Sequence, residues 1–347
     1  MDAEVRQKNR DNVCNRECVG TLIYNERIRQ SVGLSKLCDG LMSMGNLSRI
    51  KSGTRETDES IIKRLTDRLG MTFEDEGAYM FNNDYAEWQR RWRVIDAIEC
   101  GRISEAGLLI DKYERMYGRK VVREQFAKVM RIQCITSVES YENMCSSRMQ
   151  EIVRLYMEAL SLTIPVNALK NVRMFVLAID ELNMVLEYQF YRGLEGGDIT
   201  DIKLLEDILK YLDGTRFSLS AKAKLYPKTV VYMYRMLAYG RSMEVVFRDT
   251  DKKLMDKLYK YCERALDMLR ENAVRYYLTE ILEIRREFLV NGYGGGESDR
   301  LLRQTNEWLS AIHSLCCEYD VWEHMTNSCY FYKENSVYNI GTVVRVR

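Results

Sequence analysis

The stretch GLSKLCDGLMSMGNLSRIKSG, residues 33–53, decides the fold that we expect for the N-terminal part of the chain. Apolar residues recur in it at helical spacing, and glycines split it into short pieces. A further helical segment precedes the stretch and another follows it. Together the expected helices cover residues 21–30, 34–41, 44–51 and 58–69. Four short helices in about fifty residues predict a compact helical domain, to which we assign residues 19–71.

This stretch resembles the Xre-type, lambda-repressor-like helix-turn-helix domain. Gly33-Leu34-Ser35 resembles the opening of its second helix, Leu47-Ser48-Arg49-Ile50 with Gly53 resembles the end of its recognition helix, and Ile61 to Gly70 matches its closing helix. The resemblance implies that the third helix enters the major groove of double-stranded DNA with its N-terminal residues at the base edges.

Several positions of the motif have a physical rationale for DNA binding. A serine can cap a helix, a lysine beside a helix N-terminus can reach a phosphate, and asparagine and arginine pair with adenine and guanine edges. On this basis Ser35 is expected to cap the second helix and Ser43 the recognition helix. The expected DNA-binding residues are Ser35, Lys36, Ser43, Met44, Asn46, Arg49, Lys51 and Arg55.

Two positions depart from the family pattern. Lys51 stands where the family usually has a glutamate that holds an arginine of the first helix, and Gly45 lowers helix propensity at the reading end. Lys51 can therefore face Arg27 or Arg29, or point to DNA instead. The departures leave open an alternative function, in which the protein is a helical-repeat interaction module with a vestigial helix-turn-helix domain.

After Gly70 the helical segments lengthen and short glycine-containing loops separate them. Trp88 to Gly118 resembles a tetratricopeptide hairpin, with Gly101 at the turn and Ala106 where the two helices touch. Similar units recur at irregular spacing. Residues 72–335 are therefore expected to form a tetratricopeptide-like α-solenoid, which makes the whole fold all-α.

The order of these two domains resembles the Rgg- and PlcR-type peptide-responsive regulators of Gram-positive bacteria. That resemblance implies a homodimer and a short peptide effector on the concave face of the repeats. A protein that binds an extended peptide needs side-chain amides that hydrogen-bond to the peptide backbone and aromatic residues that line pockets for the peptide side chains. The candidate effector-binding residues are Asn167, Asn171, Asn183, Tyr232, Arg235 and Tyr239.

Charge and composition agree with this reading. Residues 1–70 carry 13 basic and 10 acidic residues, and the segment from Gly20 to Arg55 carries six and two, which suits a phosphate backbone. Ten cysteines without a regular framework, and no apolar N-terminal stretch, predict a cytoplasmic protein with reduced thiols and no membrane partner.

Nothing in the sequence has the pattern of an enzyme or a metal site. The chain has two histidines and no nucleophile or metalloprotease motif, so we expect no enzyme and no cofactor. His313, Cys316, Cys317, His324 and Cys329 follow helical periodicity, and no metal is expected there. Residues 1–18 are expected to be a leader, and residues 336–347 a tail that is either a strand-like end or the start of a second helix-turn-helix domain.

Overall fold

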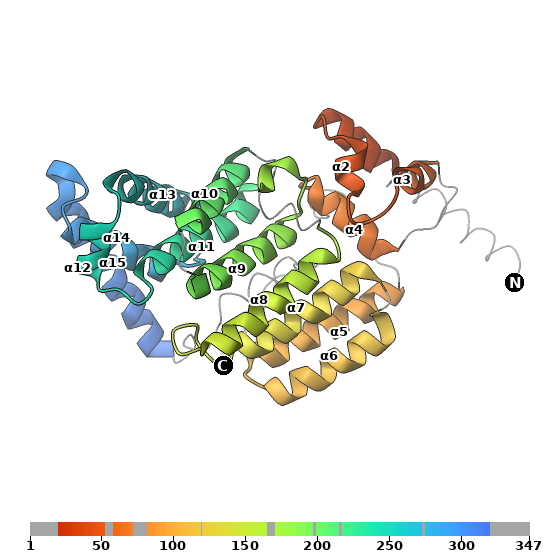
Figure 1. The fold of residues 1–347 in the computed structure, drawn as a ribbon, viewed down its shortest axis with the longest axis horizontal. Coiled ribbons are helices and arrows are strands. Elements are labelled where there is room, and N and C mark those ends of the chain that lie inside the picture. The colour runs from red at the N-terminus through yellow and green to blue at the C-terminus, as the bar shows by residue number, and fades with distance from the viewer. Residues whose placement is uncertain are drawn as a thin grey trace, which may run out of the picture.

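The computed structural model describes residues 20–52, 58–71, 82–118, 120–164, 171–196, 199–214, 217–272 and 275–319. Within these ranges the chain is helical and forms no strand, which confirms the all-α class (Figure 1). The expected leader and tail lie outside the described residues, so they stay predictions. None of the described helices combines the length and the apolar character that a bilayer crossing needs.

The N-terminal domain consists of a helix over residues 20–29, then α2 (Leu34–Cys38), α3 (Met44–Lys51) and α4 (Glu59–Arg68). The second helix is three residues shorter than expected. It ends at Cys38 because Gly40 adopts a φ of 71°, a left-handed conformation that breaks the helix. One apolar core joins all four helices and includes Ile23, Leu37, Leu47, Ile50 and Leu65.

The array begins with two antiparallel hairpins, each packed against the next (Figure 1). The first hairpin follows the sequence prediction closely. Its two helices are joined through Gly101, which has a φ of 69°, and Ala106, Ile110 and Tyr113 are buried against the neighbouring helices. The helices of these hairpins are α5 (Asn82–Glu99), α6 (Ile103–Tyr117), α7 (Val121–Thr136) and α8 (Ser146–Ser161).

The remaining helices continue the array toward the C-terminus. Consecutive helices pack against each other from α8 to α12 and from α13 to α15, and α11 also packs against α9 and α13. These helices are α9 (Ile179–Gly196), α10 (Ile199–Gly214), α11 (Leu219–Ala238), α12 (Met243–Asp249), α13 (Lys252–Glu271), α14 (Leu278–Val290) and α15 (Ser298–Tyr319), with short 3-10 turns η3 (Val172–Met174) and η4 (Gly295–Glu297). A single apolar core runs from α5 to α14, so the array is one continuous solenoid.

The N-terminal domain lies at one end of the array, where α4 packs on α7 (Figure 1). Val122 of α7 belongs to the core of the N-terminal domain, and Val176 packs against it. The two domains therefore share buried apolar surface, in addition to the polar contacts described below.

Candidate functional site

The outer side of α3 has the arrangement that a recognition helix needs. Ser43 caps the helix, as expected, and its hydroxyl accepts a hydrogen bond from the backbone N–H of Asn46 at 3.4 Å. Leu47 and Ile50 point into the domain core. Met44, at 51% exposure, and Arg49 lie on the solvent side, while Asn46 is half-buried. The helix thus offers its first two turns to a ligand and packs with its inner face.

The second helix differs from the prediction at its first residues. The expected cap by Ser35 is wrong, because α2 begins at Leu34 and its N-cap is Gly33. Gly33 has the extended backbone of a cap, so the helix starts before Ser35 is reached. Ser35 and Lys36 are both exposed, and Lys36 remains available to a phosphate. Arg55 lies outside the described residues.

Lys51 makes an intramolecular contact. Its Nζ lies 3.3 Å from the ring centroid of Tyr24 on the first helix, and the guanidinium carbon of Arg27 lies 5.1 Å from the same centroid. One aromatic ring thus holds two cations at once. The side chain of Lys51 is directed to the first helix. Tyr24 was the signal in the sequence that could have indicated this contact.

The array contains a cavity of about 820 Å³ between α11, α14 and the loop before α8. Arg235 and Tyr239, two of the expected effector residues, line it together with Tyr141. The guanidinium carbon of Arg235 lies 5.5 Å from the ring centroid of Tyr141. Partial burial raises the pKa of Tyr141 to about 12, so its hydroxyl stays protonated at neutral pH.

Carboxylates outnumber guanidinium groups in the lining of this cavity. Its acidic and basic side chains are Glu142, Glu280, Glu283, Glu287, Arg235 and Arg286. Tyrosine rings and aliphatic side chains supply the rest of the wall, and polar groups among apolar ones are typical of small-molecule and peptide sites. Tyr141 and Glu142 were not predicted as site residues, because they lie in a loop without helical periodicity.

Two other expected effector residues lie in the interior. Asn183 of α9 and Tyr232 of α11 are buried in a polar cluster around Lys228 and Glu187. Lys228 Nζ donates to Asn183 Oδ1 at 2.8 Å and also pairs with Glu187, and the hydroxyl of Tyr232 lies 3.1 Å from both carboxylate oxygens of Glu187. These side chains join α9 to α11. Neither Asn183 nor Tyr232 is among the residues that line the cavity.

The two remaining asparagines are not brought to the cavity either. Asn171 is exposed and precedes η3, and Asn167 lies outside the described residues. Of the six expected residues, the structure therefore gathers Arg235 and Tyr239 at one cavity and places Tyr232 on the inner side of the same helix.

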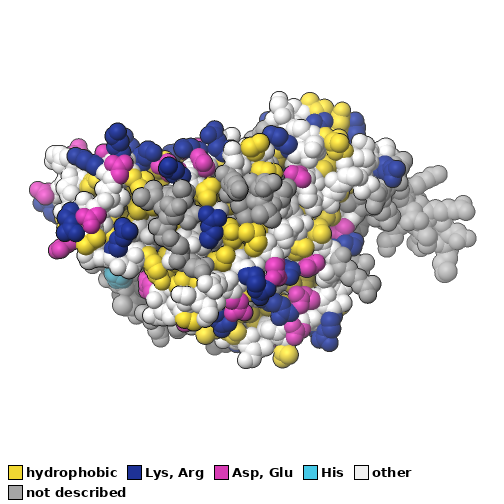
Figure 2. Space-filling view, viewed as in Figure 1, with side chains coloured by type: hydrophobic (Ala, Val, Ile, Leu, Met, Phe, Trp, Pro, Cys, Tyr) yellow, Lys and Arg dark blue, Asp and Glu magenta, His cyan; other side chains and the backbone are white. Residues whose placement is uncertain are grey.

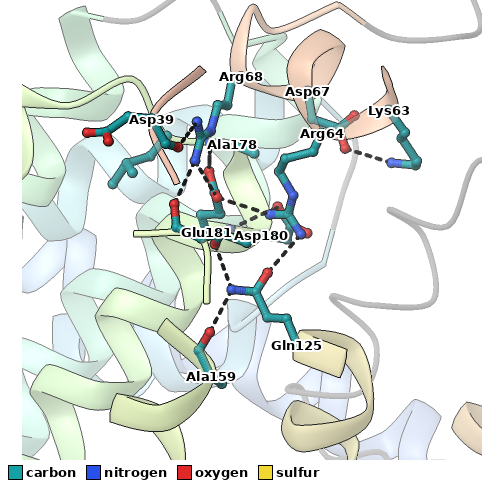
Figure 3. Close-up of polar contacts among 12 residues, drawn as sticks. Asp39, Lys63, Arg64, Asp67, Arg68, Gln125, Ala159, Ala178, Asp180 and Glu181 are labelled. Carbon is teal, nitrogen blue, oxygen red and sulfur yellow. Dashed lines mark hydrogen bonds and ion pairs between the residues drawn. The ribbon is translucent and has the colours of Figure 1, made fainter. Parts of the chain in front are cut away.

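A buried polar network joins the N-terminal domain to the array (Figure 3). Arg68 of α4 makes a bidentate pair with Glu181 of α9, with Nε and Nη2 each 2.9 Å from a carboxylate oxygen. The same guanidinium donates to the carbonyls of Leu37 at 2.9 Å, Asp39 at 2.7 Å and Thr163 at 3.0 Å. One side chain thus ties together α4, the end of α2, the end of α8 and the start of α9.

Arg64, one turn before Arg68, adds a second set of contacts. Its Nη1 lies 2.6 Å from Asp180 Oδ1, and its Nη2 donates to Gln125 Oε1 at 3.1 Å. Burial alone would raise the pKa of Glu181, but Arg68 and Arg64 outweigh it and hold that pKa below its usual value. Glu181 is therefore a carboxylate at neutral pH, as a paired buried charge must be.

Gly40 brings the two domains into backbone contact. A Cβ at this position would lie 2.1 Å from the carbonyl oxygen of Thr163, so only glycine fits. Its φ of 71° is also a conformation that favours glycine. This junction was not predicted from the sequence, because its partners lie far apart in the chain. Arg64 and Arg68, four residues apart on a helix whose inner face is apolar, were the available signal.

The array surface is mixed in charge. Figure 2 shows Lys and Arg side chains interspersed with Asp and Glu over the face drawn. A duplex needs a field of one sign over several phosphates. On this face the array offers no such field. The exposed Lys36 of α2 and Arg49 of α3 are therefore better candidates for contacts with DNA.

No protein-family model matches the chain, and no curated protein matches it. Among solved structures, the chain is similar to that of Bacillus thuringiensis PlcR in complex with the peptide PapR7 and DNA, with a TM-score of 0.43 and 13% identity over 92% of this chain and 98% of that one. These values are too low to transfer a function.

Proposed function

We propose that the protein is a sequence-specific DNA-binding transcriptional regulator whose helical array forms a homodimer and binds a peptide or small effector. The observation that carries the proposal is α3, a capped helix with an apolar inner face and exposed Met44 and Arg49 on its outer side. A helix of this kind after a short turn is the part of a helix-turn-helix that reads the major groove.

The effector part of the proposal rests on the cavity lined by Arg235 and Tyr239. Its volume of about 820 Å³ is in the range of ligand sites, and its walls are formed by α11, α14 and the loop before α8. Native mass spectrometry of the protein purified from its own host should detect a bound molecule that Arg235→Glu removes. A peptide that binds equally well to this variant would place the effector elsewhere.

DNA binding is tested by fluorescence anisotropy with the duplex from upstream of the protein's own gene. A shuffled duplex of the same composition is the control. We expect tighter binding to the native duplex, with the logarithm of affinity falling linearly with the logarithm of salt concentration. Equal affinity for both duplexes, or no salt-sensitive binding to either, would leave the interaction-module alternative.

A further inference from the structure

One helix of the array, α9, touches both the N-terminal domain and the helix that lines the cavity. Glu181 in its first turn holds Arg68 of α4, and Glu187 holds Lys228 and Tyr232 of α11. Six residues of α-helix span about 9 Å, so the two contacts lie on a short rigid segment. Both carboxylates are buried, and both have charged partners that are buried as well.

The α11 side of this connection leads directly to the cavity. Tyr232 lies three residues before Arg235, which lines the cavity wall. The ring of Tyr232 stacks on Phe190 of α9 with centroids 4.0 Å apart and meets Tyr277 edge-on at 6.5 Å. Tyr277 precedes α14, the opposite wall of the cavity, and has a φ of 57°, where an L-residue is strained. A change in the spacing of α11 and α14 therefore reaches Tyr232.

The α4 side has room to respond. A cavity of about 90 Å³ lies between α4, α5, α7 and α9, and its walls include Lys63, Arg64 and Asp67 of α4 and Asp180 and Met184 of α9. That volume is enough for a few waters. The side of α4 that faces α5, α7 and α9 is therefore not completely filled by side chains.

We propose that α9 transmits occupancy of the array cavity to the helix-turn-helix domain, with Glu187 as the positioning residue on the effector side and Glu181 on the DNA side. The inference rests on the proposed function. Releasing either buried carboxylate from its partners would leave an unpaired charge in the interior. A displacement of α11 is therefore followed by α9, and a displacement of α9 by α4, in preference to separation of the pairs.

The first test needs neither effector nor DNA. Hydrogen exchange of the full chain is followed by mass spectrometry at residues 59–68, the peptide that contains α4. Tyr232→Phe removes the hydroxyl that donates to Glu187 and leaves the ring in place. We expect hydrogen exchange in α4 to become roughly threefold faster or more. This is less than the full effect of losing one hydrogen bond to a charged group, because only part of that effect reaches α4.

Glu263→Gln is the matched control. Glu263 pairs with Arg285 at 2.7 Å between α13 and α14, and neither partner belongs to α9. This variant should change exchange locally and leave residues 59–68 as in the wild type. If exchange in α4 becomes equally faster in both variants, the effect is a general loss of stability, and the inference is overturned.

A second test fills the cavity without its natural ligand. Glu283→Cys, on the exposed part of the cavity wall, is alkylated with N-ethylmaleimide, with the wild type treated in parallel to correct for native cysteines. We expect the added group to change exchange at residues 59–68, and Glu187→Gln in the same chain to abolish that change. An effect that persists with Glu187→Gln, or no effect at all, would contradict transmission through α9. Neither result depends on whether the protein binds DNA.

Discussion

Arg68 and Glu181, which are 113 residues apart in the chain, form a bidentate ion pair with both N–O distances at 2.9 Å. Their side chains are 2% and 0% exposed. A buried ion pair adds little stability compared with well-packed apolar residues in the same place. Removal of one partner alone, however, is strongly destabilising, because the other charge stays buried. The junction between the two domains is thus specific in geometry, and it is sensitive to single substitutions.

Removal of the arginine is the most direct test of the junction. Arg68→Ala removes the bidentate partner of the buried Glu181 carboxylate, leaves it only the longer 3.7 Å pair with Arg64, and also frees the carbonyls of Leu37 and Asp39. We expect the free energy of unfolding to fall by about 3–5 kcal/mol in urea denaturation. Arg29→Ala removes an exposed ion pair with Glu26 and should leave the unfolding midpoint near that of the wild type. A wild-type midpoint for Arg68→Ala would mean that the pair does not form in solution.

The lowered pKa of Glu181 predicts how stability depends on pH. The folded state holds the carboxylate charged, so its pKa is lower than in the unfolded chain. The corresponding stabilisation is complete above the unfolded pKa, about 4.3, and is lost as the pH falls through the lower folded value. The difference in unfolding free energy between the wild type and Glu181→Gln should therefore be constant from pH 7 to about pH 5 and shrink below about pH 4. A difference that grew with acid would contradict the assignment.

Two glycines of the N-terminal domain give opposite expectations for the same substitution. At Gly40 a methyl group meets the Thr163 carbonyl and φ is positive, so Gly40→Ala should destabilise the protein and weaken the docking of the domain. At Gly45, on α3, a Cβ meets nothing within 4 Å. Gly45→Ala should raise the unfolding free energy by up to about 1 kcal/mol, because alanine has the higher helix propensity. Thermal unfolding of both variants is the measurement, and destabilisation by Gly45→Ala would be the contrary result.

Local structure was the part of this fold that sequence patterns could predict. The helix Met44–Lys51 and its cap at Ser43 agree with the prediction, because both depend on residues within one turn of each other. The cap at Ser35 was wrong for a similar local reason. Serine and glycine both occupy N-cap positions, and spacing alone does not tell which of them precedes the first helical residue.

Contacts between helices could not be predicted from local sequence patterns. Asn183 and Tyr232 were predicted to contact an effector, yet they meet Lys228 and Glu187 in the interior. A periodic pattern shows which side of a helix is polar, but not that two polar sides face each other. Arg68 and Glu181 are separated by four intervening α-helices, α5 to α8, so their pairing follows only from the assembled array.

Lys51 is expected to contribute to stability rather than to DNA affinity. Its Nζ is 3.3 Å from the Tyr24 ring centroid, so Lys51→Met should lower the unfolding free energy by about 0.5–1 kcal/mol through loss of the cation–π contact. The effect should largely vanish when Tyr24 is already leucine, which a double-mutant cycle measures. Additive effects of the two substitutions would mean that the side chains do not interact. A reduced salt dependence of DNA binding in Lys51→Met would instead assign the residue to a phosphate.

Arg49 is the residue of α3 whose substitution tests base reading. It lies one turn into the helix on the exposed side, opposite Ile50 of the core. Arg49→Ala should weaken binding to the native duplex by about 1–3 kcal/mol and reduce the preference over the shuffled duplex, because an arginine at a base edge contributes to specificity. Arg154→Ala, on the exposed face of α8, removes the same charge far from α3 and should leave both affinities unchanged. If Arg49→Ala weakens both duplexes equally, the residue contacts the DNA backbone. If neither affinity changes, α3 does not present this side to DNA.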